Sequence, residues 1–438
     1  MVREVRSDAA EVGAAAVVED DALTVERVAG LDIGKGSLTV CVRTPAEGGG
    51  RRRRQSLRDY ATFTPRLLGL ADWLRVERVE LVAMEATGDY WRPVFYLLEA
   101  EGFTCWLCNP KHIKNLPGRP KTDRQDAVWL AKVAERGMCR PSLVHPQPTR
   151  RIQDLTRYRR SLVQDQTREK QRLEKLLEDA QVKLSSVISD IFGVSGRQML
   201  AALIAGERNP RRLADLAHGR MRTKTPILEQ ALTGHFADHH AFLAQAMLTR
   251  IDELGLLIDQ VSARIEDLMA EEPFRRAVRV LDEIPGVGQR AAEDLIAEIG
   301  LDMTRFRTAA QLVSWAKFAP MERSSAGRSR AASTGKGNPW LAGTLGEVVA
   351  AAARTDTFLG ARYRRLARRR GKRRAIVAVG NSVLIVIWHL LADPEGHFVE
   401  LGSDWHESRI NTAKRERDLI RRLQAVTGKK VILQPNAA

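Results

Sequence analysis

A run of nearly forty residues without proline or glycine constrains the fold of this chain more than any other feature. It reads "RRIQDLTRYRRSLVQDQTREKQRLEKLLEDAQVKLSSVI", and its leucines recur at near-helical intervals among alternating charges. This pattern predicts one long helix, typical of a coiled-coil arm that pairs with another subunit. A second amphipathic stretch, "HHAFLAQAMLTRIDELGLLIDQVSARIEDLMAEE", can return antiparallel to the first. We therefore predict a helical, coiled-coil spacer over residues 149–272.

The residues before this spacer alternate between strand and helix signals. "VAGLDIGKGSLTVCVRT" indicates a strand pair hinged at two glycines, and "RRRRQSLRDY" indicates a third strand. After a helical stretch, the apolar strand in "RVELVAMEA" ends at Glu85, and helix, strand and helix follow. Hairpin strands first, and strands interleaved with helices afterwards, predict a mixed α/β sheet of the ribonuclease-H kind over residues 28–148.

The residues after the spacer carry mostly helical patterns, and we predict a second domain over residues 273–410. In "LDEIPGVGQRAAEDLIAEIG", Pro285, Gly286 and Gly288 permit a tight turn between two helices. Backbone N–H groups at such a turn can face a phosphate, which is the helix-hairpin-helix arrangement. A plain helix-connecting turn is the alternative. The loop "APMERSSAGRSRAASTGKGN" follows, crowded with small and basic residues.

Neither end of the chain predicts a membrane segment. Residues 1–27 form an acidic extension without a long apolar core, which argues against a signal peptide, and residues 411–438 form a basic tail. The most apolar stretch, Ala375 to Ala392, is interrupted by glycine, asparagine and histidine, which favours a buried core helix. We expect a cytoplasmic protein without a membrane partner.

The charge balance indicates a polyanionic partner. The 438 residues include 70 Lys and Arg against 54 Asp and Glu, a formal charge of +16. Such an excess favours binding to nucleic acid. The run "RTDTFLGARYRRLARRRGKRR" holds ten basic residues and one acid, so we expect it to contact phosphates, with a solvated helix face as the alternative.

The four cysteines indicate neither a disulfide scaffold nor a zinc site. Cys105 and Cys108 form a CxxC motif, but a structural zinc site needs a second ligand pair at suitable spacing, and Cys41 and Cys139 do not supply it. A redox CxxC motif should open a helix, whereas this one lies in a strand-like run. We interpret the motif as structural.

Four acidic residues form the candidate metal site. Asp32 is the only acid in the apolar "AGLDIGKGSLTV", and Glu85 ends an apolar strand. Asp123 and Asp126 are spaced i,i+3, so they share one helix face, where like charges repel unless a cation lies between them. Mg²⁺ prefers several carboxylate oxygens that converge on one point. Singly, each acid is also consistent with a helix-start, strand-end or solvated charge.

These residues lie in motifs that resemble a known family. The chain is similar to the DEDD transposases of the insertion-sequence "one-ten" family, relatives of the pilin-gene inversion recombinase, over roughly residues 28 to 410. The motifs that carry the resemblance follow in order: "LDIGKGS", "MEATGDYWRPVFYLLE", "KNLPGRPKTDRQDAVWLAKV", "IPGVGQRAAEDLIAEIG", "SSAGR" with "GKGN", and "RYRRLARRRGKRRAIVAV".

The resemblance implies a fold, a metal site and a nucleophile. The first domain should resemble the RuvC Holliday-junction resolvase and hold Mg²⁺ through Asp32, Glu85, Asp123 and Asp126. The second should supply the serine that attacks DNA, which the motif places at Ser325. The family usually has glutamate before this serine, whereas this chain has Ser324; we prefer Ser325 as the nucleophile over Ser324.

The predicted function is that of an insertion-sequence transposase that cleaves and rejoins DNA through a transient phosphoserine link. The resemblance further implies a bridge RNA guide and a homodimer or tetramer, joined through the helical arm, with a composite site. The alternatives are a RuvC-like junction-resolving nuclease that uses metal-activated water and a non-catalytic nucleic-acid-binding protein. The predicted nucleic-acid contacts are Lys121, Arg124, Gly286, Gly288, Arg323, Arg328, Arg330, Lys336, Arg365, Arg369 and Arg373.

Overall fold

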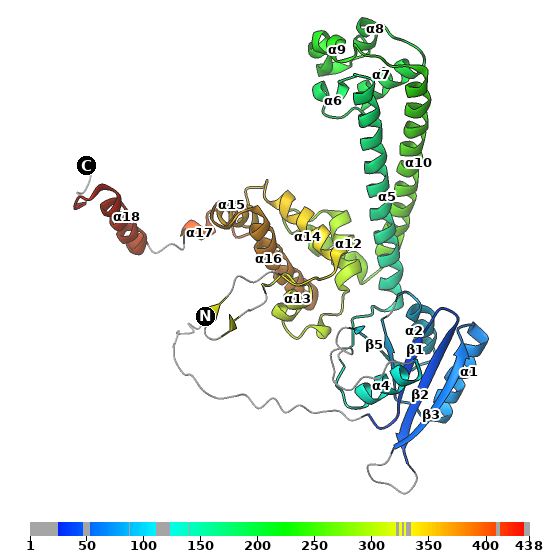
Figure 1. The fold of residues 1–438 in the computed structure, drawn as a ribbon. Helices are drawn as coiled ribbons and strands as arrows, with labels where there is room; N and C mark the ends of the chain where they lie inside the picture. The colour runs from blue at the N-terminus through cyan, green and yellow to red at the C-terminus, as the bar shows by residue number, and fades with distance from the viewer. Residues whose placement is uncertain are drawn as a thin grey trace. The chain divides into compact units, whose positions relative to one another are not determined.

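The computed structural model divides into two compact units, and the boundary lies between Val144 and His145. Figure 1 shows the elements of both units as a ribbon. The structure describes residues 25–46, 53–86, 88–110, 123–139, 141–320, 324–325, 328–329, 334–408 and 412–432.

The first unit is built on a five-stranded mixed sheet in the order β3-β2-β1-β4-β5. β1, β2 and β3 pair antiparallel, whereas β4 pairs parallel with β1 and β5 pairs parallel with β4. A hairpin half followed by a parallel half confirms the mixed α/β sheet expected from the sequence. The elements of this unit are β1 Val28–Ile33, β2 Ser37–Pro45, β3 Arg53–Ala61, α1 Thr64–Val76, β4 Leu81–Glu85, α2 Trp91–Ala100, β5 Thr104–Cys108 and α4 Asp123–Glu135.

Helices cover both faces of this sheet. α1 and α2 bury one face through a cluster that includes Leu31, Val40 and Met84. α4 covers the opposite face through a second cluster that includes Val28 and Ala83. Because side chains alternate between the faces along a strand, the residues that share the α4 face with Val28 and Ala83 follow at every second position.

The second unit begins with a long helical hairpin. α5 Gln147–Asp179 and α10 Asp238–Met269 run antiparallel, since Gln166 donates a hydrogen bond to the carbonyl of Ile251 whereas Asp179 meets His240 (Figure 1). The predicted long helix and its antiparallel return are therefore present within one chain. Pairing with another subunit remains a prediction.

A small helical cap joins the two long helices at their far end (Figure 1). It has its own apolar core, which includes Leu200, Leu213 and Leu228 together with residues of α5 and α10. The sequence pattern indicates only a spacer here, because the cap helices are too short to show a clear period. They are α6 Leu184–Val187, α7 Val194–Ile204, α8 Pro210–Ala214, the 3-10 helix η1 Gly219–Lys224 and α9 Thr225–Ala231.

The remainder is mostly helical, and α11, α13, α14 and α15 pack against the apolar helix α16. Val379, Val383 and Ile387 of α16 are buried. By length and composition alone α16 could cross a membrane, but core helices of globular proteins have the same properties. The elements are α11 Phe274–Asp282, α12 Gln289–Ile299, η2 Met303–Arg305, α13 Ala309–Trp315, β6 Ser324–Ser325, β7 Arg328–Ser329, α14 Pro339–Ala352, α15 Phe358–Arg370, α16 Lys372–Ala392, α17 Trp405–Ser408 and α18 Thr412–Thr427.

Candidate active site

A row of polar residues crosses the sheet at the level of Asp32. Asp32 of β1 pairs with Thr39 of β2, and Thr39 pairs with Asp59 of β3. On the other side, Leu31 pairs with Met84 in parallel register, so the next positions, Asp32 and Glu85, lie at the same level of adjacent strands. Two acids distant in sequence are therefore neighbours at the carboxyl ends of β1 and β4, the edge where α/β sheets bind ligands.

Both acids lie on the face that α4 covers. Asp32 follows Gly30 at every second position along β1, and Glu85 follows Ala83 in the same way along β4. Both side chains are half-buried, whereas the residues that precede them on this face are buried. Asp32 and Glu85 therefore lie at the edge of the interface between the sheet and α4.

Gly30 lets α4 approach the sheet closely. A Cβ atom at Gly30 would lie 2.4 Å from the carbonyl oxygen of Ala127 and 2.4 Å from the amide nitrogen of Ala131. Only glycine permits this approach, because real Cβ atoms do not come so close to backbone atoms. Asp126, half-buried, directly precedes Ala127, so the close approach brings its part of α4 over β1, two residues before Asp32.

The structure brings three of the four predicted acids to one side of the sheet, although their carboxylate oxygens do not all lie within 4.8 Å of one another. Asp32, Glu85 and Asp126 come from three elements on one side of the sheet, and Asp123 is the first residue of α4, one helical turn before Asp126. The side chain of Asp123 lies outside the described part of the chain. Carboxylate oxygens from several elements are the ligands that Mg²⁺ prefers. These residues could hold it.

Asp59 is a further acid that sequence reasoning missed. Its carboxylate accepts a hydrogen bond from the Thr39 hydroxyl, at 2.8 Å, and forms an ion pair with Arg124 of α4, at 3.1 Å. These contacts, with the Thr39 hydrogen bond first, lower the pKa of Asp59 below its ordinary value. Arg124, predicted to contact nucleic acid, is therefore held at the start of α4 by this exposed pair. The strand pattern of "RRQSLRDYA" with the β2–β3 register would have been the signal.

The segment with the candidate nucleophile forms a short backbone ladder. Ser324 pairs with Ser329, and Ser325 pairs with Arg328, as β6 and β7. The side chains of these residues lie outside the described part of the chain, as do Lys121, Arg323 and Arg330 altogether. Lys336, which follows the ladder, is exposed.

The two predicted glycines of the helix hairpin differ in their surroundings. Gly286 has φ +91°, and a Cβ atom there would lie 2.5 Å from the carbonyl oxygen of Val348 in α14. Packing against α14 therefore accounts for this glycine. Gly288, in contrast, is exposed at the start of α12, and a Cβ atom there would meet no other atom within 4 Å.

A hollow of about 510 Å³ opens beside Gly288. Its polar lining includes Arg290 and three acids, of which Asp294 pairs with Arg159 and Glu347 pairs with Arg160. Burial is the main cause that raises the pKa of Asp294 above its ordinary value. A phosphate at Gly288 would meet an open helix N-terminus and Arg290, but also the third acid, Glu266.

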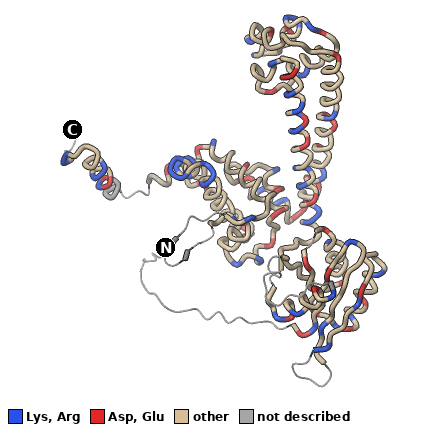
Figure 2. Tube along the Cα trace, in the orientation of Figure 1, with Lys and Arg blue, Asp and Glu red and all other residues tan. Residues whose placement is uncertain are grey.

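Basic residues concentrate on α15 and the start of α16 (Figure 2). Arg364 serves the fold, because it donates to the carbonyls of Ala353 and Thr355. Seven others are exposed, and none of them forms an ion pair with a described residue. They are Arg365, Arg368, Arg369, Arg370, Lys372, Arg373 and Arg374.

The CxxC motif lies in β5, as expected from its strand-like pattern. Cys105 packs into the cluster under α1 and α2, whereas Cys108 packs into the cluster under α4. The two thiols lie on opposite faces of the sheet and cannot bind one zinc ion. Cys108 instead meets Cys139, with the sulfur atoms 3.3 Å apart.

Comparison with known proteins gives family matches in two separate parts of the chain. Residues 29–181 match the DEDD_Tnp_IS110 family model, described as "Transposase", and residues 278–364 match the model "Transposase IS116/IS110/IS902 family". The "Transposase for insertion sequence element IS1111A" of Coxiella burnetii is 25% identical over 380 residues, which are 79% of this chain and 93% of that protein. The "Insertion element IS110 uncharacterized 43.6 kDa protein" of Streptomyces coelicolor is 29% identical over 230 residues, 48% of this chain and 55% of that protein.

Among solved structures, RuvC of Thermus thermophilus matches with 18% identity and a TM-score of 0.21, over 26% of this chain and 99% of RuvC. The same resolvase in complex with a Holliday junction substrate matches with 18% identity and a TM-score of 0.20, over 27% of this chain and 99% of that chain.

Proposed function

Because this chain belongs to the IS110 family of insertion-sequence transposases, we propose that it cleaves and rejoins DNA through a transient phosphoserine link at Ser325. The observation that carries the catalytic half of this proposal is the position of Asp32 and Glu85 at the same level of β1 and β4, beneath the helix that bears Asp126. The serine itself is carried over from the family motif.

We assign the same role, metal binding, to the four carboxylates. Asp32, Glu85, Asp123 and Asp126 would hold Mg²⁺. When bound, Mg²⁺ neutralises phosphate charge and lowers the pKa of a coordinated hydroxyl. The Ser325 oxygen forms the bond to phosphorus while the bond from phosphorus to a deoxyribose oxygen breaks. The serine proton leaves and the departing oxygen takes up a proton. Because one phosphodiester bond replaces another, no energy-rich cofactor is needed. Attack by a second strand reverses the step and rejoins the DNA.

Substrate recognition rests on cations in both units. Lys121 and Arg124 stand beside the acids in sequence, and Arg323, Arg328, Arg330 and Lys336 flank the serine, where they would clamp the scissile phosphate. The exposed cations of α15 and α16 suit a second nucleic acid, and the family resemblance suggests that this is a structured guide RNA. We further propose a dimer or tetramer, in which the serine of one subunit can complete the carboxylate site of another.

A covalent adduct tests the serine. The protein, purified with its bound RNA from cells that carry the element's flanking DNA, is incubated with that DNA and Mg²⁺, and protein–DNA adducts are separated under denaturing conditions. Ser325→Ala should abolish the adduct. Ser324→Ala and Ser329→Ala are matched controls on the same ladder and should retain it.

Other outcomes would reject the proposal. Strand cleavage without an adduct in the wild-type protein, and full cleavage by Ser325→Ala, would indicate a resolvase that uses water. Binding without any Mg²⁺-dependent cleavage would indicate a non-catalytic protein. Loss of the adduct in Ser324→Ala alone would move the nucleophile by one residue.

A further inference from the structure

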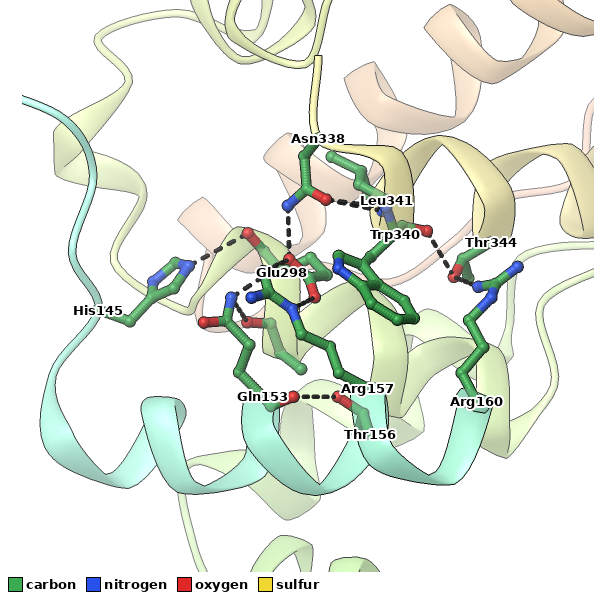
Figure 3. Close-up of polar contacts among 11 residues, drawn as sticks. His145, Gln153, Thr156, Arg157, Arg160, Glu298, Asn338, Trp340, Leu341 and Thr344 are labelled. Carbon is green, nitrogen blue, oxygen red and sulfur yellow. Dashed lines mark hydrogen bonds and ion pairs between the residues drawn. The ribbon is translucent and has the colours of Figure 1, made fainter. Parts of the chain in front are cut away.

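Glu298 of α12 is the centre of a buried polar network in the second unit (Figure 3). Its side chain is only 2% exposed. Arg157 of α5 grips both carboxylate oxygens, with N–O distances of 2.7 and 2.8 Å. Gln153, one turn earlier on α5, also donates to this carboxylate, at 3.2 Å. The first turns of α5, which form the root of the helical arm, are thus fixed to α12 through one charged side chain.

A third segment reaches the same carboxylate. The amide nitrogen of Asn338 donates to Glu298, and the amide oxygen of Asn338 accepts from the backbone N–H groups of Trp340 and Leu341. Asn338 is the N-cap of α14. Both ends of its side-chain amide are therefore used, and a flipped amide would place its oxygen against the carboxylate.

Asn338 also ends residues 316–338, the segment that carries the candidate nucleophile and is named the serine segment. The ladder of β6 and β7 comes before it, and the segment after the ladder returns to the one before it: a Cβ atom at Gly337 would lie 2.5 Å from the carbonyl oxygen of Ala316. A Cβ atom at Gly335 would lie 3.1 Å from the side chain of Lys317. The serine segment is therefore closed at its base, directly beside the contact of Asn338 with Glu298.

A buried ion pair is a poor way to gain stability alone. Desolvation of the charges offsets much of their attraction, and apolar side chains would join α5 and α12 as well. Charged, directional contacts can instead specify one arrangement of the parts that they join. The parts joined here are the root of the arm, α12 of the helix hairpin and the base of the serine segment.

We propose that Glu298 is a positioning residue, which couples the root of the helical arm to the serine segment through Arg157 and Asn338. A displacement of α5 at its root, such as one caused by a partner bound to the arm, moves the base of the serine segment with it. This inference rests on the proposed role of Ser325 in its consequence for catalysis, but the mechanical coupling stands by itself.

Asn338→Ser is the informative variant. Serine is also a good N-cap, so α14 keeps its cap while the contact with Glu298 is lost. Asn209→Ser is the matched control, because Asn209 caps α8 in the same way, through Arg211 and Arg212, far from Glu298 in sequence. Hydrogen exchange of the full-length protein without DNA is measured on peptides that cover residues 316–341. We expect faster exchange in Asn338→Ser than in Asn209→Ser.

A second variant tests the same contact through its charge. Asn338→Asp places two carboxylates against each other while α14 keeps a good N-cap. We expect this variant to exchange fast and to form the DNA adduct about 100-fold more slowly, the loss that a displacement of about 1 Å can cause. Asn209→Asp is the matched control on α8 and should change neither measurement.

The two measurements fail independently. Equal exchange in Asn338→Ser and Asn209→Ser, or in Asn338→Asp and Asn209→Asp, would overturn the coupling. Absence of an adduct in the wild-type protein would refute the role of Ser325, while the exchange results would still decide on the coupling.

Discussion

Gly30 of β1 and Ala127 of α4 touch through their backbones, because a Cβ atom at Gly30 would lie 2.4 Å from the Ala127 carbonyl oxygen. This contact sets the height of α4 above the sheet and with it the distance between Asp126 and the acids of the strands. Gly30 therefore affects the geometry of the proposed metal site, although it has no functional side chain of its own.

Gly30→Ala should push α4 away from β1. The added methyl group overpacks a buried interface, which costs about 1–3 kcal/mol of the free energy of unfolding. We expect Mg²⁺ binding, measured by isothermal titration calorimetry, and Mg²⁺-dependent cleavage to weaken together. Gly36→Ala, in the turn after the same strand, is the control, since no atom lies within 4 Å of its added Cβ. Wild-type Mg²⁺ affinity in Gly30→Ala would contradict the placement of Asp126.

The ion pair between Arg124 and Asp59 predicts a specific pattern of DNA binding. The pair is exposed, so Asp59→Asn should change the free energy of unfolding by less than about 1 kcal/mol. If Arg124 contacts a phosphate, Arg124→Gln should weaken DNA binding and reduce the slope of log K against log salt by about 1. Asp59→Asn should leave or strengthen binding, because it frees Arg124.

The control for this pattern is Arg75→Gln, which removes another exposed, ion-paired arginine from α1, on the opposite side of the sheet. Fluorescence anisotropy over a salt series gives both the affinity and the slope. Equal slopes for Arg124→Gln and Arg75→Gln would show that Arg124 serves only its pair with Asp59.

His145 predicts how stability depends on pH. Its ring donates to the Glu298 carbonyl at 3.1 Å, and burial is the main cause that lowers its pKa below the ordinary value of about 6.5. The unfolded chain therefore binds the proton more readily than the folded chain. The free energy of unfolding should decrease as pH falls below about 6.5, until the folded-state pKa is passed.

His145→Gln tests this sign, because glutamine can still donate to the carbonyl but does not titrate. Urea unfolding at several pH values between 7.5 and 5.5 should give a smaller loss of stability in the variant than in the wild-type protein. Parallel pH profiles would mean that His145 titrates normally in the folded state.

Cys41 and Cys105 should be unreactive in the folded protein. Burial raises the pKa of Cys41 to about 11 and that of Cys105 to about 12, so few thiolates exist at pH 8. Alkylation by iodoacetamide at pH 8, followed by mass spectrometry of peptides, should be slow at both residues and become fast in urea. Rapid labelling of native Cys105 would point to a reactive CxxC motif.

The sequence was sufficient where local patterns decide the structure. The period-two strands, the long helix and its return predicted the main elements, and Asp32 and Glu85 stood out because they interrupt apolar strands. Asp59 could not be found in the same way, since its importance depends on the register of β3 with β2. The position of Glu298 in a polar network could not be predicted from the sequence for a similar reason. Its partner Arg157 is 141 positions away, and a buried ion pair leaves no periodic signal.

The exposed cations of α15 and α16 predict a steep salt dependence of nucleic-acid binding. Arg365, Arg369 and Arg373 project from an exposed segment and have no carboxylate partner among the described residues. Each phosphate contact that is lost should reduce the salt slope by about 0.7 for single strands or about 0.9 for duplex DNA. The triple change to glutamine should therefore lower the slope by about 2–3, as measured by filter binding with DNA and with the co-purified RNA separately.

A matched triple change on the arm, at Arg168, Arg172 and Arg250, removes cations that have carboxylate partners and should affect the slope less. The free energy of unfolding is measured on the same preparations. A lower salt slope with an unchanged free energy of unfolding would assign the basic segment to phosphate contact. Equal salt slopes in the two triple variants would leave it as a solvated helix face.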